Sequence, residues 1–196
     1  FFDAAAILRA LACAPHGIES IVEFGSGYGT FSIPAARATA GVVTAFDIEP
    51  ELVEALQQHA LRQHLFNLRV DVRDFVHDGT GLPDGSVDHV MLYNILHIED
   101  PVALLSEARR ILKANGAGSV IHWRSDIATP RGPTLAIRPQ PHDCVRWATL
   151  AGFDQYCLVD ISAFAPYHFG LILHNRSGHM PSPLARNDSS TLESTT

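Results

Sequence analysis

The sequence predicts a single α/β domain, a three-layer sandwich whose seven-stranded sheet is mostly parallel with an antiparallel last strand. Three observations predict this fold. Short β-rich apolar runs alternate with helix-periodic segments from residue 18 to about residue 160. Glycines close the first of these runs. The chain has 196 residues, 46% of them hydrophobic, which is enough for one substantial core.

The first half of the chain alternates between strand and helix patterns. Strands are predicted where apolar and β-branched residues cluster, at residues 18–24, 42–46 and 68–72. One helix is expected at residues 30–39, and a second begins at Pro50, because proline is favoured at the first position of a helix. The apolar residues of this second helix recur at helical spacing: Leu52, Val53, Leu56 and Ala60.

The second half repeats this alternation after a stretch of turn signals. Asp100 and Pro101 predict the cap and first turn of a helix that Asn115-Gly116 ends, and a further helix is expected at residues 142–151. The remaining strands are predicted at residues 87–93, 119–123, 155–160 and 168–174, the last two as neighbours. In such a sheet, ligands bind at the carboxyl ends of the strands.

Both ends of the chain lie outside this alternation. Ile7, Leu8 and Leu11 share one helical face and predict an amphipathic helix; the alternative, a signal-peptide end, lacks a basic leading region. The missing initial Met suggests that upstream residues are absent. Residues 175–196 are rich in Ser, Thr, Pro and Asn and are expected to be disordered, which leaves residues 1–174 as the domain.

Composition excludes several classes of protein. A net charge of −7 argues against binding to nucleic acid, and no apolar run approaches the length of a membrane span. Three widely spaced cysteines fit reduced thiols in a cytoplasmic protein. The eleven histidines show no spacing typical of metal ligands, so we expect no metal site.

A glycine-rich turn, residues 25–29, follows the first strand and precedes a helix. Its Gly-x-Gly-x-Gly spacing, after the acid Glu23, differs from the Gly-x-Gly-x-x-Gly of dinucleotide-binding folds. About twenty residues later Asp47 ends the second strand, where an acid can accept hydrogen bonds from ribose hydroxyls. The alternatives are a plain strand-to-helix turn and an acid that caps the helix at Pro50.

Three segments taken together resemble the successive motifs of class I S-adenosylmethionine-dependent methyltransferases. They read VEFGSGYG at residues 22–29, AFDIEPEL at 45–52 and LPDGSVDHV at 82–90. The similarity is to the type 11 or ubiquinone/menaquinone-biosynthesis-like group and covers residues 18–174. It implies a Rossmann-like fold, S-adenosyl-L-methionine as cofactor with S-adenosylhomocysteine as product, and a small or medium-sized methyl acceptor.

The resemblance assigns cofactor contacts to the ends of the first two strands. It places Glu23 near the methionine end, and Gly25 and Gly27 beneath the amino-acid moiety and the sugar. Asp47 is expected to hold the ribose, with Ile48 against the adenine ring.

The next strands carry further expected contacts. By resemblance, Asp74 accepts from the adenine amino group, Phe75 adds apolar contact, and Asn94 faces the transferable methyl; a turn acid beside a core aromatic is the alternative for the first two. His97 and His122 are expected to face the same space, as a general base or as histidines that line the substrate or serve the structure.

An irregular loop at residues 125–141, with its flanks, is the candidate substrate-binding element. Arg124 and Arg138 are candidates to pair with an acidic substrate group, and Tyr167 to line the same wall; solvated surface side chains are the alternative. We expect the substrate to bind in a compact pocket, either formed by this chain alone or completed by a second subunit, as in a homodimer. Two other functions stay open: an NAD(P)-binding oxidoreductase, and a non-catalytic module that binds a cofactor or a partner.

Overall fold

The computed structural model describes residues 3–13 and 17–175, so the predicted disorder of the tail lies almost entirely outside the described residues. The strands of its single sheet are β1 (Ser20–Phe24), β2 (Val42–Asp47), β3 (Leu68–Val72), β4 (Val87–Tyr93), β5 (Leu112–Trp123), β6 (Gln155–Val159) and β7 (His168–His174). The helices are α1 (Ala4–Ala10), α2 (Ser32–Ala38), α3 (Pro50–Arg62), α4 (Pro101–Ile111) and α5 (Pro141–Leu150), with a 3₁₀ turn at Leu135–Ile137.

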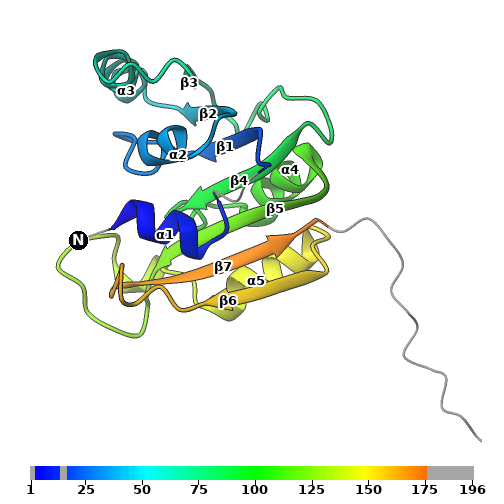
Figure 1. The fold of residues 1–196 in the computed structure, drawn as a ribbon. Coiled ribbons are helices and arrows are strands. Elements are labelled where there is room, and N and C mark those ends of the chain that lie inside the picture. Colours follow the sequence, from blue (N-terminus) through cyan, green and yellow to red (C-terminus); the bar gives the residue numbers. More distant parts are fainter. Residues whose placement is uncertain (1–2, 14–16, 176–196) are drawn as a thin grey trace, which may run out of the picture.

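The sheet has the order β3-β2-β1-β4-β5-β7-β6. Strands β1 to β5 pair in parallel, whereas β7 runs antiparallel to both of its neighbours, β5 and β6. Helices α1, α2 and α3 cover one face of the sheet and α4 and α5 the other (Figure 1). The predicted α/β fold class, with seven strands and the antiparallel strand, is therefore confirmed.

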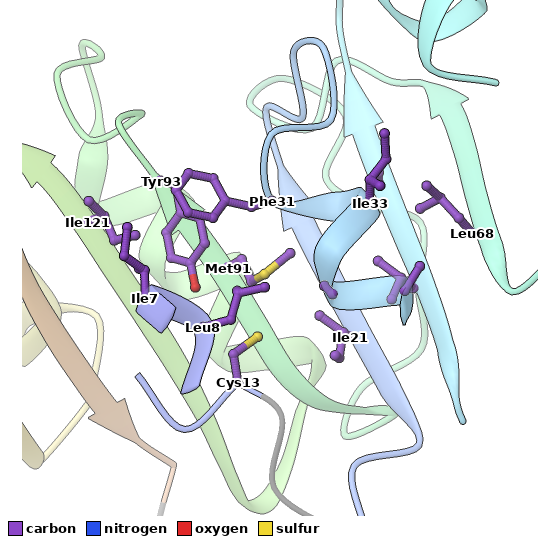
Figure 2. Packing of buried hydrophobic residues seen from close by; sticks show 14 of the residues in the cluster. Ile7, Leu8, Cys13, Ile21, Phe31, Ile33, Leu68, Met91, Tyr93 and Ile121 are labelled. Carbon is purple, nitrogen blue, oxygen red and sulfur yellow. The ribbon is translucent and has the colours of Figure 1, made fainter. Parts of the chain in front are cut away.

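The first face of the sheet is sealed by apolar side chains from α1 and α2. Figure 2 shows Ile7 and Leu8 of α1 lying over Met91 and Tyr93 of β4, all of them buried. The ring of Phe31 meets Tyr93 edge to face, with centroids 4.6 Å apart. Each large apolar side chain buried in this way contributes on the order of 2 kcal/mol, so the predicted amphipathic N-terminal helix is an integral part of the core.

The start of β5 differs from the sequence prediction. The helix α4 ends at Ile111 and the strand begins at once, so Asn115-Gly116 lies inside the strand instead of ending the helix. The cause is a distant partner. Asn175 donates its side-chain amide to the carbonyl oxygens of Leu112 and Lys113, and its backbone exchanges hydrogen bonds with Asn115 and Gly116. The left-handed φ of +69° at Asn115 is thus a bend within the strand.

Among the described residues, no helix combines the length and the apolar character needed to cross a membrane.

Candidate functional site

The carboxyl ends of the five parallel strands meet at one edge of the sheet, and the strand order reverses between β1 and β4. In open α/β sheets this reversal opens a crevice in which ligands bind. All the predicted cofactor residues lie at or just beyond these strand ends. The topology therefore brings together side chains that are up to seventy residues apart in the chain.

The glycine loop after β1 is held against β2. The backbone N–H groups of Gly25 and Ser26 both donate to the carbonyl of Phe46, at 2.9 and 3.0 Å. Gly25 has a φ of +76°, which other residues rarely adopt, and a Cβ there would lie 2.7 Å from Ile95 Cδ1, so glycine is strongly favoured. Gly27 has a φ of +51°, and a Cβ there would meet nothing within 4 Å. The loop thus presents bare backbone to open space at Gly27.

Asp47 is fixed at the end of β2 by two backbone donors. Its Oδ2 accepts from the N–H of Gly27 at 2.7 Å, and its Oδ1 accepts from the N–H of Glu49 at 3.1 Å. The residue is only 7% exposed. Because each carboxylate oxygen can accept more than one hydrogen bond, the pair remains able to receive two vicinal hydroxyls. The next residue, Ile48, is an exposed apolar side chain.

Asp74 and Phe75 follow β3 in a tight turn. Asp74 Oδ1 accepts from the N–H of His77 at 3.0 Å, and its Oδ2 has no partner among the residues that the structure describes. The ring of Phe75 stacks on that of Phe24, with centroids 5.1 Å apart. Phe75 therefore belongs to the core and anchors the turn, which leaves one carboxylate oxygen of Asp74 for a ligand.

Two buried polar atoms near the strand reversal, Ser26 Oγ and Asn94 Oδ1, have no hydrogen-bond partner among residues 3–13 and 17–175. Asn94 has a left-handed φ of +57°, and its N–H donates to the carbonyl of Ile121 at 2.7 Å. Burying a polar atom without a partner costs about 1–3 kcal/mol, so such atoms indicate a ligand site. Sequence reasoning identified Asn94 but missed Ser26, which stands at a variable position of the glycine motif.

Glu23 lies beneath the glycine loop, on the face covered by α2. Its carboxyl is 2% exposed and accepts a hydrogen bond from Ser32 Oγ. Burial raises the pKa of Glu23 to about 8, with a smaller contribution from the carboxylate of Asp47 and against the lowering effect of Ser32. At neutral pH this carboxyl is therefore mainly protonated, and its hydrogen bond with Ser32 links β1 to α2.

His97, in the loop after β4, meets His122, the last residue but one of β5. His97 Nδ1 lies 3.3 Å from His122 Nε2, a contact that joins residues 25 positions apart in the chain. His122 is fully buried, and burial lowers its pKa to about 4. The side chain of His97 is exposed, and partial desolvation lowers its pKa as well. Both rings are accordingly neutral at pH 7.

Arg124 and Tyr167 meet beside a pocket of about 270 Å³. The backbone N–H of Arg124 donates to the carbonyl of Tyr167, at 2.9 Å. Its guanidinium pairs with Asp126 through two hydrogen bonds, of 2.9 and 2.6 Å. The pocket is lined by Arg124, Ser125, Asp126, Gln140, Pro141 and Phe169.

Arg138 was predicted to pair with an acidic group of the substrate, but its guanidinium is bonded within the protein. It is only 7% exposed, and each nitrogen of its guanidinium donates to an oxygen of the loop. These acceptors are the carbonyl oxygens of Arg124, Arg131 and Pro133 and the hydroxyl of Thr129. Arg138 therefore clamps the loop, and its expected role as a substrate ligand is replaced by a structural one.

The described residues contain no group of three or more His, Cys, Asp or Glu side chains that suits a metal ion.

Comparisons with known proteins agree with this geometry. A family model for the methyltransferase domain matches residues 21–116. A methyltransferase structure from Sulfolobus solfataricus, assigned to type 11, superposes with a TM-score of 0.62 at 27% identity and covers 83% of this chain and 88% of its own. The family model and this structure together support a class I S-adenosylmethionine-dependent methyltransferase similar to those of type 11.

More distant structures share the fold. An S-adenosylmethionine-dependent methyltransferase from Aquifex aeolicus superposes with a TM-score of 0.78 at 21% identity, over 89% of this chain and 90% of that one. The [4+2]-cyclase SpnF reaches a TM-score of 0.70 at 16% identity, over 89% and 81% of the two chains. A comparison with curated proteins gives no match. The fold is thus shared with a protein that is described as a cyclase.

Proposed function

We propose that this methyltransferase binds S-adenosyl-L-methionine along the ends of β1, β2 and β3 and transfers its methyl group to a small or medium-sized molecule beyond β4 and β5. The observation that carries the proposal is a group of polar atoms at the strand reversal between β1 and β4. There the carboxylate of Asp47 is bonded to bare backbone at Gly27, beside the unpartnered atoms Ser26 Oγ and Asn94 Oδ1.

The residues present suit an adenosine group attached to an amino acid. Asp47 has acceptor capacity left for the two ribose hydroxyls, and exposed Ile48 offers an apolar surface to the adenine ring. Asp74 Oδ2 is available to accept from the adenine amino group. Asn94 Oδ1 is available to the methionine portion, which carries an ammonium group and therefore a donor.

When bound, the cofactor supplies a methyl group that its sulfonium sulfur has already activated. The chain's own residues then have to align the acceptor, exclude water and take up any proton that the acceptor loses. His97 and His122 are the candidates for proton uptake, because both are neutral near pH 7 and lie in contact with each other at the carboxyl ends of β4 and β5.

Two other functions predict different ligands. An NAD(P)-dependent oxidoreductase would bind a dinucleotide at the same edge, but neither the glycine spacing nor the matching family model favours it. A non-catalytic module, or a protein that uses the fold for another reaction as SpnF does, would bind the cofactor without methylating any acceptor.

Isothermal titration calorimetry separates these functions. We expect S-adenosylmethionine and S-adenosylhomocysteine to bind and NAD(P) not to bind. Asp47→Ala should weaken binding of S-adenosylhomocysteine by about 10- to 100-fold, because hydrogen bonds to a charged acceptor contribute about 1.5–3 kcal/mol. Asp71→Ala removes an exposed carboxylate on β3 and is the matched control. Binding of NAD alone would refute the proposal, and cofactor binding without transfer of a labelled methyl group to any acceptor would favour the non-catalytic alternative.

A further inference from the structure

The strand β3 stands at one end of the sheet and leaves an edge open (Figure 1). Among the described residues it pairs only with β2, over Leu68–Val72 and without a bulge. Natural proteins commonly protect such an edge with proline, lysine or a bulge, because its free backbone groups can pair with another strand. Residues 68–72 contain none of these devices, so the edge is available to a further strand.

The hydrogen bonds to β2 determine which backbone groups point outward. The N–H of Arg73 donates to the carbonyl of Asp47 at 2.8 Å, so Arg73 faces β2. Successive residues of an extended strand present their backbone groups to opposite sides. The backbone groups of Leu68, Val70 and Val72 therefore face away from β2, towards the open edge.

Two of these outward groups have partners within the chain. The N–H of Leu68 donates to the carbonyl of Leu65 at 3.2 Å, and the carbonyl of Val70 accepts from Gln57 Nε2 at 2.7 Å. A carbonyl oxygen has two lone pairs, so that of Val70 can accept a second hydrogen bond. The N–H groups of Val70 and Val72 face no strand in the part of the chain that the structure describes.

The side chains of β3 alternate between apolar and charged. Leu68 and Val70 are buried in the cluster beneath α3, so Arg69 and Asp71, which are exposed, lie on the opposite face of the strand. Neither charged side chain is paired with another described residue. The edge therefore carries one free positive and one free negative charge, two residues apart.

We propose that β3 is the surface through which two copies of this chain associate. The two β3 strands pair antiparallel about a two-fold axis at Val70 and join the two sheets into one. In this register Arg69 of each copy lies opposite Asp71 of the other, and Leu68 lies opposite Val72. Opposite charges that face each other across two strands stabilise the pair. The inference goes beyond the proposed function and does not depend on it.

The same charges disfavour the neighbouring registers. A pair centred on residue 69 would place Arg69 directly opposite Arg69 of the second copy, and a pair centred on residue 71 would do the same with Asp71. Like charges directly opposite destabilise a strand pair. The order basic, apolar, acidic is thus complementary to itself in the register centred on Val70.

Exposed apolar side chains flank the same edge. Phe66, just before β3, is 79% exposed and Leu61 of α3 is 60% exposed; with Leu65 they help to line a pocket of about 430 Å³ against β3. The two-fold axis is perpendicular to the sheet, so α3 of both copies lies on the same face of the joined sheet. Pairing then removes from water apolar surface that a single chain leaves exposed.

The opposite edge of the sheet, β6, does not offer this match. The side chains of β6 are largely exposed, but Asp154 and Asp160 flank the strand. An antiparallel pair centred on Cys157 would place these carboxylates of the two copies opposite each other, twice. Of the two edges, β3 is the one whose charges favour a second copy.

Sedimentation velocity over a range of protein concentrations tests the assembly. The wild type should change from monomer to dimer as the concentration rises. Arg69→Asp and Asp71→Arg should each weaken the dimer by about 10- to 100-fold, because each variant turns both attractive pairs into repulsive ones. The double variant Arg69→Asp/Asp71→Arg exchanges the two charges and should restore the dimer. A mixture of the two single variants should form a heterodimer, which also shows that both are folded.

Asp154→Arg makes the same change of charge beside β6 and is the matched control. It should leave the dimer unchanged. A dimer that Asp154→Arg strengthens and that the β3 variants leave unchanged would lie at β6 and would overturn the proposal. Failure of the double variant to restore the dimer would overturn the register.

Amide hydrogen exchange gives a readout at single residues. Exchange at the N–H groups of Val70 and Val72 should slow as the protein concentration rises, because the second copy covers them. Slow exchange that does not depend on concentration would show that the chain covers this edge itself, and it would overturn the proposal. A wild type that remains monomeric at high micromolar concentration would do so too, whether or not another protein binds the edge.

Discussion

The buried carboxyl of Glu23 makes the stability of the fold depend on pH in an unusual direction. Most carboxyl groups have a lower pKa in the folded state and therefore stabilise a protein as the pH rises. Glu23 behaves in the opposite way, because burial raises its pKa from 4.5 to about 8. Its protonated form is fully stabilising below pH 4.5, and this stability is lost as the pH rises through 8.

The size of the effect follows from the shift. Between the two pKa values the folded state holds a proton that the unfolded chain has released, so the free energy of unfolding falls by about 1.4 kcal/mol per pH unit. At pH 7 the accumulated loss is about 3 kcal/mol. Glutamine stays neutral and can still accept from Ser32, so Glu23→Gln should remove this loss and raise the stability at pH 7 by up to about 3 kcal/mol.

Urea unfolding of wild type and Glu23→Gln at pH 5, 6, 7 and 8 measures the effect. His89, His122 and His168, whose pKa values burial lowers to about 4, give the opposite slope between pH 4 and 6.5. Because they are common to both proteins, their contribution cancels in the difference. Glu54→Gln, on the exposed face of α3, is the control. A difference between Glu23→Gln and wild type that stays constant with pH would refute the reasoning.

Two further variants test the loops of the site. Gly27→Ala should lower the free energy of unfolding by only about 1 kcal/mol, since the φ of +51° is the main source of strain. It should nevertheless weaken S-adenosylhomocysteine binding about tenfold or more, because the new methyl group enters the open space beside the loop. An unchanged affinity in calorimetry would contradict the proposed cofactor site. Arg138→Ala should destabilise the protein by about 1–3 kcal/mol and speed hydrogen exchange in residues 124–138, because partly buried carbonyl oxygens of the loop lose a charged donor. The exposed Arg146→Ala should change neither, and equal effects of both arginine variants would argue against the clamp.

Strands defined by local patterns were predictable from the sequence. The strands β3, β4 and β7 have the same bounds in the structure as in the prediction, because each is a β-rich run bounded by turn residues. The start of β5 was not predictable, since Asn115-Gly116 is also a typical helix end. Only the approach of Asn175, sixty residues away, turns it into a bend within a strand.

The candidate site shows the same division. The contact between Gly27 and Asp47 follows from a motif at each end of two neighbouring strands, so the sequence indicated it. The clamp of Arg138 could not be foreseen, because its acceptors are carbonyls of an irregular loop that no periodicity describes. Ser26 was missed for a related reason: burial without a partner is a property of the folded loop, which the residue type alone does not reveal.

The proposed site has a cofactor half and an acceptor half, and different parts of the chain form them. This explains why the acceptor is harder to infer than the cofactor. The cofactor half is fixed by backbone geometry and one carboxylate, which a short motif specifies. In the proposed site, the acceptor half is made of side chains from β5, the loop after it and β7, among them the neighbouring rings of His122 and Phe169. A fold does not fix the reaction, and this one is shared by proteins described as a methyltransferase and as a [4+2]-cyclase. Since only the acceptor half can separate such reactions, the activities of variants at His97 and His122 report on the chemistry of this protein more directly than any similarity of fold.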